Sequence, residues 1–125
     1  MFLVDTNIFL EVILRQNRKE DCKRFLGDNK GKLNITDFSL HSIGVILFKH
    51  GKENVFLKFI KDIVPNVKIV SLPSENYGQT VKTGRNFNLD FDDAYQYSVA
   101  DYFGFKMVTM DRDFHKIKNA KILFL

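Results

Sequence analysis

Short apolar runs alternate with helix-forming segments along the whole of this sequence, and few architectures accommodate that order. We predict strands at residues 1–4, 32–36, 67–72, 106–110 and 120–125. We predict helices at residues 8–14, 18–28, 37–51, 52–63, 73–83 and 90–103, with a loop at 84–88. Strands that alternate with helices form a parallel sheet with helices on both faces. The sequence therefore predicts an α/β fold, and its length of 125 residues is that of one domain, 1–125.

The first ten residues, MFLVDTNIFL, place an acidic side chain at the end of a buried strand. An apolar run without alternation is typical of a strand that is shielded from water on both faces. Asp5 follows this run, and Thr6 and Asn7 are residue types that begin helices. Ligands of parallel α/β sheets bind outside the carboxyl ends of the strands. Asp5 is therefore either a metal ligand or only the cap of the first helix.

Further acidic residues are expected at the same edge of the sheet. Asp111 ends the fourth predicted strand, and Asp113 lies two residues later. The helix at 90–103 runs antiparallel to the strand that follows it, so its first turn, with Asp93, lies at this edge too. Asp90 is expected to cap that helix. If the first and fourth strands are neighbours, Asp5 and Asp111 start roughly 5 Å apart, the spacing between strands.

Carboxylates that meet at one edge repel one another unless a cation or protons compensate. A ligand set made only of oxygen favours Mg²⁺ or Mn²⁺ over zinc. Such a cation can activate water and stabilise a pentacoordinate phosphate, so the acids predict a divalent-metal site for phosphate chemistry. We also expect Asp5→Asn to abolish this chemistry and to leave the metal-free fold as stable or more stable, because it relieves the repulsion.

Composition restricts the location and the partners of the protein. Cys22 is the only cysteine, so neither an internal disulfide nor a cysteine-rich zinc site can form. No apolar run is long enough to span a bilayer, and the N-terminus lacks the regions of a signal peptide, so we expect a cytoplasmic protein without a membrane segment. The net charge of +4 suits an anionic partner such as nucleic acid.

Three motifs resemble the PIN domain family and, within it, the VapC-type toxins. They are LVDTNIFLEV at the start, LDFDDAYQYSVA in the third quarter and VTMDRDF near the end, and together they extend over nearly the whole chain. The resemblance implies a three-layer α/β/α fold with a five-stranded parallel sheet, and RNA cleavage that depends on Mg²⁺ or Mn²⁺. It implies that Asp5, Asp93 and Asp111 are the catalytic acids and metal ligands. Asp113 would join them as a ligand, and Asn7 would help to hold Asp5.

The second acid of the family pattern is missing. The family usually has a Glu in the helix after the second strand, and the aligned position is Ser42, within ITDFSLHSIGVIL. His41 beside it is either a substitute ligand, a phosphate contact, or a polar residue with no chemical role. Asp37, one turn earlier, is close enough in sequence to reach a metal through water.

The resemblance implies an endoribonuclease that is the toxin of a toxin–antitoxin pair, with RNA as substrate, an antitoxin protein as partner and a homodimeric state. The Phe-rich segments at 37–51 and 52–63 can supply an apolar face for that dimer. Lys82, Arg85 and Arg112 are candidates for contacts to RNA phosphates, and each is equally consistent with solvated surface charge. The alternative function is a PIN-like RNA-binding or interaction module whose incomplete acidic site does not cleave.

Overall fold

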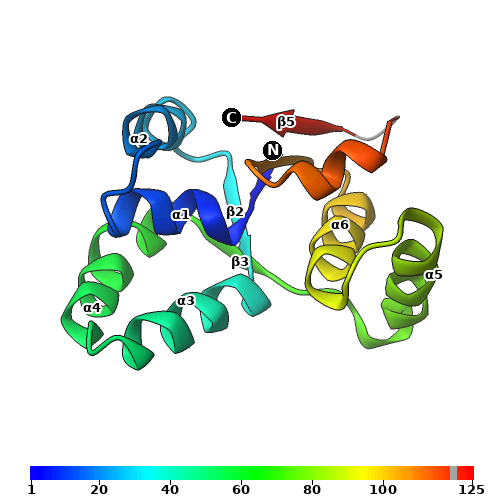
Figure 1. Cartoon of the computed structure of the whole chain (residues 1–125), viewed down its shortest axis with the longest axis horizontal. Coiled ribbons are helices and arrows are strands. Elements are labelled where there is room, and N and C mark those ends of the chain that lie inside the picture. The colour runs from blue at the N-terminus through cyan, green and yellow to red at the C-terminus, as the bar shows by residue number, and fades with distance from the viewer. Residues whose placement is uncertain (119–120) are drawn as a thin grey trace.

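Five parallel strands form one sheet in the order β3-β2-β1-β4-β5 (Figure 1). The computed structural model describes residues 1–118 and 121–125. The strands are β1 (Phe2–Val4), β2 (Leu33–Thr36), β3 (Lys68–Val70), β4 (Lys106–Thr109) and β5 (Ile122–Phe124). Val4 pairs with Val108 in the β1–β4 register, so Asp5 follows one strand where Thr109 ends the other. The predicted five-stranded parallel sheet is confirmed, and the first and fourth strands are neighbours, which is the condition for Asp5 and Asp111 to start close together.

Helices cover both faces of the sheet and give the molecule three layers (Figure 1). Side chains alternate between the two faces of a strand, so Val4 packs on one face and Leu3 on the other. The face of Val4 is covered by α1 (Thr6–Ile13), α2 (Lys19–Asp28), α3 (Asp37–Lys49) and α4 (Glu53–Asp62). The face of Leu3 is covered by α6 (Phe91–Phe103), against which α5 (Tyr77–Phe87) packs. The short 3-10 helices are η1 (Val64–Asn66), η2 (Ser74–Asn76) and η3 (Arg112–Lys116).

The helix predicted at 73–83 is present but begins and ends later, and the predicted loop at 84–88 is wrong. Helix α5 begins at Tyr77, after η2, and continues through Gly84 to Phe87. It ends because Asn88 adopts the left-handed conformation, with φ of 51°. A Cβ atom at Gly84 would lie 3.4 Å from the carbonyl oxygen of Leu89 and 3.7 Å from Cβ of Ala94. Gly84 therefore allows close packing against α6 and does not end the helix.

The remaining differences concern the ends of elements. Helix α1 begins at Thr6, earlier than predicted, because Asp5 caps it by accepting a hydrogen bond from the Thr6 amide at 2.8 Å. Strand β3 is shorter than the predicted 67–72. Residue 120, the predicted start of the last strand, lies outside the described residues. Among the residues that the structure describes, no helix has both the length and the apolar character that crossing a membrane requires.

Candidate active site

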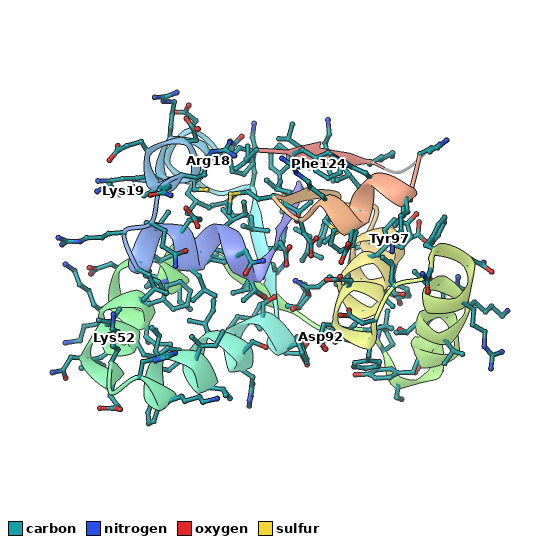
Figure 2. All side chains as sticks on the ribbon, in the orientation of Figure 1. Arg18, Lys19, Lys52, Asp92, Tyr97 and Phe124 are labelled. Atoms are coloured by element: carbon teal, nitrogen blue, oxygen red, sulfur yellow. The ribbon has the colours of Figure 1, made fainter. Side chains whose placement is uncertain are left out.

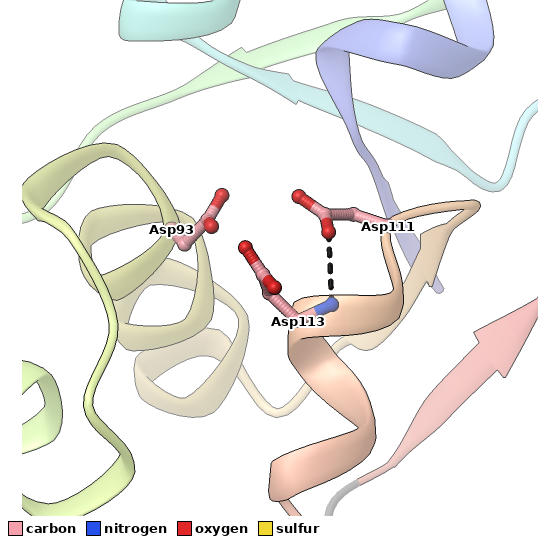
Figure 3. Close-up of side chains that lie close together, drawn as sticks. All are labelled: Asp93, Asp111 and Asp113. Atoms are coloured by element: carbon pink, nitrogen blue, oxygen red, sulfur yellow. Dashed lines mark hydrogen bonds between the residues drawn. The ribbon is translucent and has the colours of Figure 1, made fainter.

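Three carboxylates converge at the carboxyl edge of the sheet (Figure 3). Asp93 lies in the first turn of α6, Asp111 follows β4, and Asp113 lies in η3, and their oxygens are within 4.8 Å of one another. The amide of Asp113 donates a hydrogen bond to Oδ1 of Asp111 at 2.9 Å, which fixes the turn between them. Asp90 caps α6 as predicted, since its Oδ1 accepts a hydrogen bond from the Asp93 amide at 3.0 Å. Local capping and turn geometry thus aim the three side chains at one point.

The electrostatics of this cluster suit a divalent cation. Burial, followed by the negative charges of Asp90, Asp111, Asp5 and Asp113, raises the pKa of Asp93 from 3.8 to about 7. A proton therefore compensates part of the repulsion in the metal-free protein near neutral pH. An all-oxygen ligand set that already attracts a proton fits Mg²⁺ or Mn²⁺, which would take the place of that proton.

Asp5 is buried beside the three-acid cluster and is not a member of it within the described residues. Its Oδ2 accepts a hydrogen bond from the Thr109 hydroxyl at 2.7 Å, and its Oδ1 accepts from the Thr6 amide and from Nε2 of Gln96 at 3.3 Å. The Thr109 hydroxyl also accepts a hydrogen bond from the Asp111 amide at 2.9 Å. Burial raises the pKa of Asp5. Asp5 is thus a helix cap and, through Thr109, is also linked to the acid cluster.

A buried polar network holds Asp5, and sequence analysis missed it. Gln96 accepts a hydrogen bond from the Thr36 hydroxyl at 2.6 Å and donates one to the Ser39 hydroxyl at 2.7 Å. The Thr6 hydroxyl donates to the same Ser39 oxygen at 2.7 Å. One signal was available, because Gln96 follows Asp93 by three residues and so lies on the same face of the helix. These hydrogen bonds thus connect α1, α3 and α6 beneath the site.

The position of the missing second acid is not filled by another ligand among residues 1–118 and 121–125. Ser42 is half-buried in α3, and His41 beside it is exposed. Asp37 accepts a hydrogen bond from the Tyr95 hydroxyl at 2.8 Å. His41 and Asp37 line a separate pocket together with Tyr95, and neither belongs to the three-acid cluster.

The remaining candidate residues are dispersed around the site. Asn7 is exposed, and the side-chain hydrogen bonds to Asp5 in the described part of the chain come from other residues. Arg112 adjoins Asp111 in a groove of about 620 Å³ that Asn7 also lines. Arg85 lines a different groove, of about 390 Å³, between α5 and the start of α6. The structure therefore places Arg112 in the groove of Asp111 and Arg85 in a different groove that Asp90 also lines, while Lys82 is exposed on α5.

The family model described as the PIN domain matches residues 2–120, so the chain belongs to the PIN domain family. No curated protein sequence gives a significant match. Solved structures with the same fold include three that are less than 20% identical to this chain. A toxin–antitoxin complex from Klebsiella pneumoniae is 18% identical with a TM-score of 0.79, and the match covers 98% of this chain and 96% of that one.

The other two structures are as distant in sequence. VapC20 from Mycobacterium tuberculosis, described as a sarcin–ricin loop cleaving toxin, is 14% identical with a TM-score of 0.79, covering 97% of this chain and 98% of that one. FitAcB from Neisseria gonorrhoeae is 19% identical with a TM-score of 0.71, covering 100% of this chain and 97% of that one. Identities this low establish a shared fold, and the chain of this protein spans nearly the whole length of each match.

Proposed function

We propose that this protein is an endoribonuclease that depends on Mg²⁺ or Mn²⁺ and is the toxin of a toxin–antitoxin pair. The observation that carries the proposal is the convergence of Asp93, Asp111 and Asp113 at the carboxyl edge of a PIN domain sheet. Asp5 lies beneath them and is held by Thr109. Phosphate ester cleavage by a divalent cation needs such a set of fixed oxygen ligands.

The residues of the site have distinct roles in the proposed reaction. Asp93, Asp111 and Asp113 would hold the cation directly, and Asp5 would contribute negative charge beneath it. When bound, the cation would activate water and offset the charge that develops on the phosphate. Arg112, exposed next to Asp111, would contact a neighbouring RNA phosphate.

We further propose that the chain acts as a single domain, 1–125, in the cytoplasm, that it forms a homodimer, and that an antitoxin protein binds it. One of the structures with the same fold, from Klebsiella pneumoniae, is described as a toxin–antitoxin complex. The groove next to Asp111 is a candidate site for the antitoxin. Its apolar lining comes from Leu10, Leu14, Ile46 and Met110.

A second function is favoured by one observation. Ser42 stands where the family usually has a Glu, and no other acid in the described residues joins the cluster from α3. A PIN domain with this site could bind RNA without cleaving it. This alternative predicts weak or absent binding of Mn²⁺, which calorimetry measures directly.

The experiment that tests the proposal is incubation of structured RNAs with the protein in Mn²⁺ and in EDTA. We expect cleavage only in Mn²⁺, and we expect Asp93→Asn to abolish it because the cation loses a ligand. Asp101→Asn is the matched control, because Asp101 is an exposed acid on the same helix and lies outside the cluster. Cleavage by Asp93→Asn at the rate of the Asp101→Asn control would place the reaction elsewhere.

A further inference from the structure

A pocket of about 280 Å³ lies beside the acids, and its walls are mostly aromatic. It is lined by Asp37, Phe38, His41, Tyr77, Phe91 and Tyr95. These residues come from the first two turns of α3 and α6 and from the start of α5. Figure 2 shows the start of α6, with Asp92 labelled, next to the start of α3. Phe91 precedes Asp93 by two residues. The pocket and the acid cluster therefore share the first turn of α6.

The rings of the pocket are arranged around Tyr95. Phe91 stacks on Tyr95 with a centroid distance of 6.1 Å and an interplanar angle of 24°, and Tyr77 packs at 5.7 Å. The hydroxyl of Tyr95 donates to Asp37 and accepts a hydrogen bond from the Leu72 amide at 3.1 Å, so its ring is fixed. Phe91 is 55% exposed and Tyr77 is 43% exposed, so both keep surface free for a ligand. Exposed aromatic rings on a rigid support are what unpaired bases stack on.

The polar groups of the pocket select an uncharged ring over a phosphate. Among the residues that the structure describes, no lysine or arginine lines it, and its carboxylate, Asp37, would repel an anion. Oδ1 of Asp37 accepts the Tyr95 hydrogen bond, whereas Oδ2 accepts none from residues 1–118 and 121–125. A free carboxylate oxygen on the wall of an aromatic pocket pairs with an N–H donor. Adenine, cytosine and guanine supply that donor as an exocyclic amino group. Uracil supplies one only at N3, between two carbonyl oxygens that the carboxylate would repel.

We propose that this pocket binds an unpaired nucleobase that carries an amino group, next to the phosphodiester that the acids would cleave. The inference rests on the proposed function, because it takes the ligand to be part of the RNA substrate. The base stacks on Phe91 and Tyr77, with His41 at the exposed rim, and its amino group donates to Asp37. The backbone of that nucleotide then lies at the first turn of α6, close to Asp93. The protein accordingly selects RNA with a single-stranded adenine, cytosine or guanine beside the cleaved bond.

The test is fluorescence anisotropy in EDTA with labelled single-stranded RNAs that cannot be cleaved under these conditions. The three probes are a uridine strand with one central adenosine, the all-uridine strand, and the same strand with one abasic position. We expect the adenosine strand to bind most tightly. Phe91→Ala should weaken its binding about 5- to 150-fold, the range that loss of one base–aromatic stack produces. Asp37→Asn should remove the preference for adenosine over uridine while binding persists, because its amide nitrogen would face the base as a donor.

Two further variants make the test specific. Tyr102→Ala is the matched control, since Tyr102 is 49% exposed at the far end of the same helix and should leave the affinity unchanged. Phe91→Leu keeps an apolar side chain without a ring and should bind as weakly as Phe91→Ala, and thermal melting should show both variants folded. Equal affinity of wild type for all three strands would overturn the inference, and so would equal effects of Phe91→Ala and Tyr102→Ala.

Light scattering and cleavage in Mn²⁺ separate the remaining outcomes. If Phe91→Ala changes the oligomeric state but not the base preference, the pocket is a contact between copies of the chain and the inference is wrong. If Phe91→Ala does not change the rate of cleavage, the proposed function remains supported and the proposed base-binding role of the pocket is wrong. Base-selective binding without cleavage would support the base-binding role of the pocket and contradict the proposed ribonuclease activity.

Discussion

Asp93 and Asp5 are both acidic residues of the site with a raised pKa, and they differ in the hydrogen bonds that their carboxylates accept. The carboxylate of Asp93 faces other carboxylates, and the hydrogen bond to Asp90 involves only the backbone amide of Asp93. Both oxygens of Asp5 accept hydrogen bonds, from Thr6, Gln96 and Thr109. Sequence alone predicted that neutralising Asp5 would relieve repulsion. The structure extends that expectation to Asp93. At Asp5 it adds an opposing cost, because a substitution there also loses hydrogen bonds that partly offset the burial that raises the pKa of Asp5.

We predict that the metal-free protein loses stability as the pH rises through the range in which Asp93 ionises. The pKa of Asp93 is about 7 in the folded protein and 3.8 as an ordinary carboxyl group. Between these values the folded state binds more protons than the unfolded state, so the free energy of unfolding falls with rising pH and levels off above about 7. Thermal melting in EDTA from pH 5 to 8 measures this fall.

The variant Asp93→Asn should flatten that pH dependence and melt above wild type at pH 8 in EDTA. Added Mn²⁺ should raise the melting temperature of wild type and change that of the variant little. Asp101→Asn should behave like wild type in both respects, since Asp101 is exposed and outside the cluster. A wild-type melting temperature that stays constant over this range would contradict the raised pKa.

We predict that Asp5→Asn destabilises the metal-free protein by about 1 kcal/mol, the size of one lost hydrogen bond. The Asp5 carboxylate accepts hydrogen bonds through two oxygens, whereas the amide of an asparagine has only one. The NH₂ group of that amide must therefore face Thr109 or Gln96, which now donate to the carboxylate. The measurement is urea unfolding in EDTA at pH 7, with Asp93→Asn beside it. The two substitutions should shift the midpoint in opposite directions. A stabilised Asp5→Asn would show that repulsion outweighs the hydrogen bonds at this position.

At the scale of elements, helix α5 shows where sequence patterns mislead. Gly84 and the polar residues after it predicted a loop, because glycine and asparagine often end helices. The helix passes Gly84 because α6 packs closely there, which no local pattern reveals. It ends at Asn88, whose φ of 51° is the conformation expected of a residue that follows a helix. Gly84 and Asn88 are both residue types that end helices. The packing of α6 against Gly84 determines that the helix continues to Asn88.

We predict that Asn88→Ala destabilises the protein by about 1 kcal/mol and that Asn88→Gly does not. The left-handed conformation costs a residue with a Cβ atom about 1–2 kcal/mol, and asparagine and glycine tolerate it better than alanine does. The Asn88 carbonyl, which accepts a hydrogen bond from Lys116 at 3.0 Å, is present in both variants. Chemical denaturation of the pair gives the difference directly. Equal stability of the two variants would mean that the end of α5 relaxes without strain.

At the scale of the whole molecule, the sheet was predictable and the interior of the site was not. Alternation of strands and helices fixes a parallel sheet, and the acids at strand ends and helix starts then share one edge. That reasoning anticipated Asp93 and Asp111 together. It could not anticipate Ser39 or Thr109, because a buried polar residue is recognised only when its partners from other elements are known. For Gln96 the only signal was its spacing of three residues from Asp93.

The last prediction concerns the outer surface of α3 and α4. Val45 is 65% exposed, Phe48 is 59% exposed and Leu57 is 51% exposed, whereas Phe59 packs into the core. Apolar side chains that gather on a surface mark contacts between proteins, and identical copies most often pair by a two-fold axis. We expect light scattering to show a dimer at high protein concentration. Phe48→Asp should convert it to a monomer, because pairing would bury two charges without partners.

A matched control distinguishes this surface from other exposed apolar residues. Val81 is 55% exposed on α5, on the other side of the sheet, so Val81→Asp introduces the same charge at a similar exposure. It should leave the dimer intact, and both variants should melt near wild type because neither side chain is buried. A dimer that survives Phe48→Asp and dissociates in Val81→Asp would move the interface to α5. A wild-type monomer at every concentration would show that Val45, Phe48 and Leu57 are covered by a different partner or remain open to water.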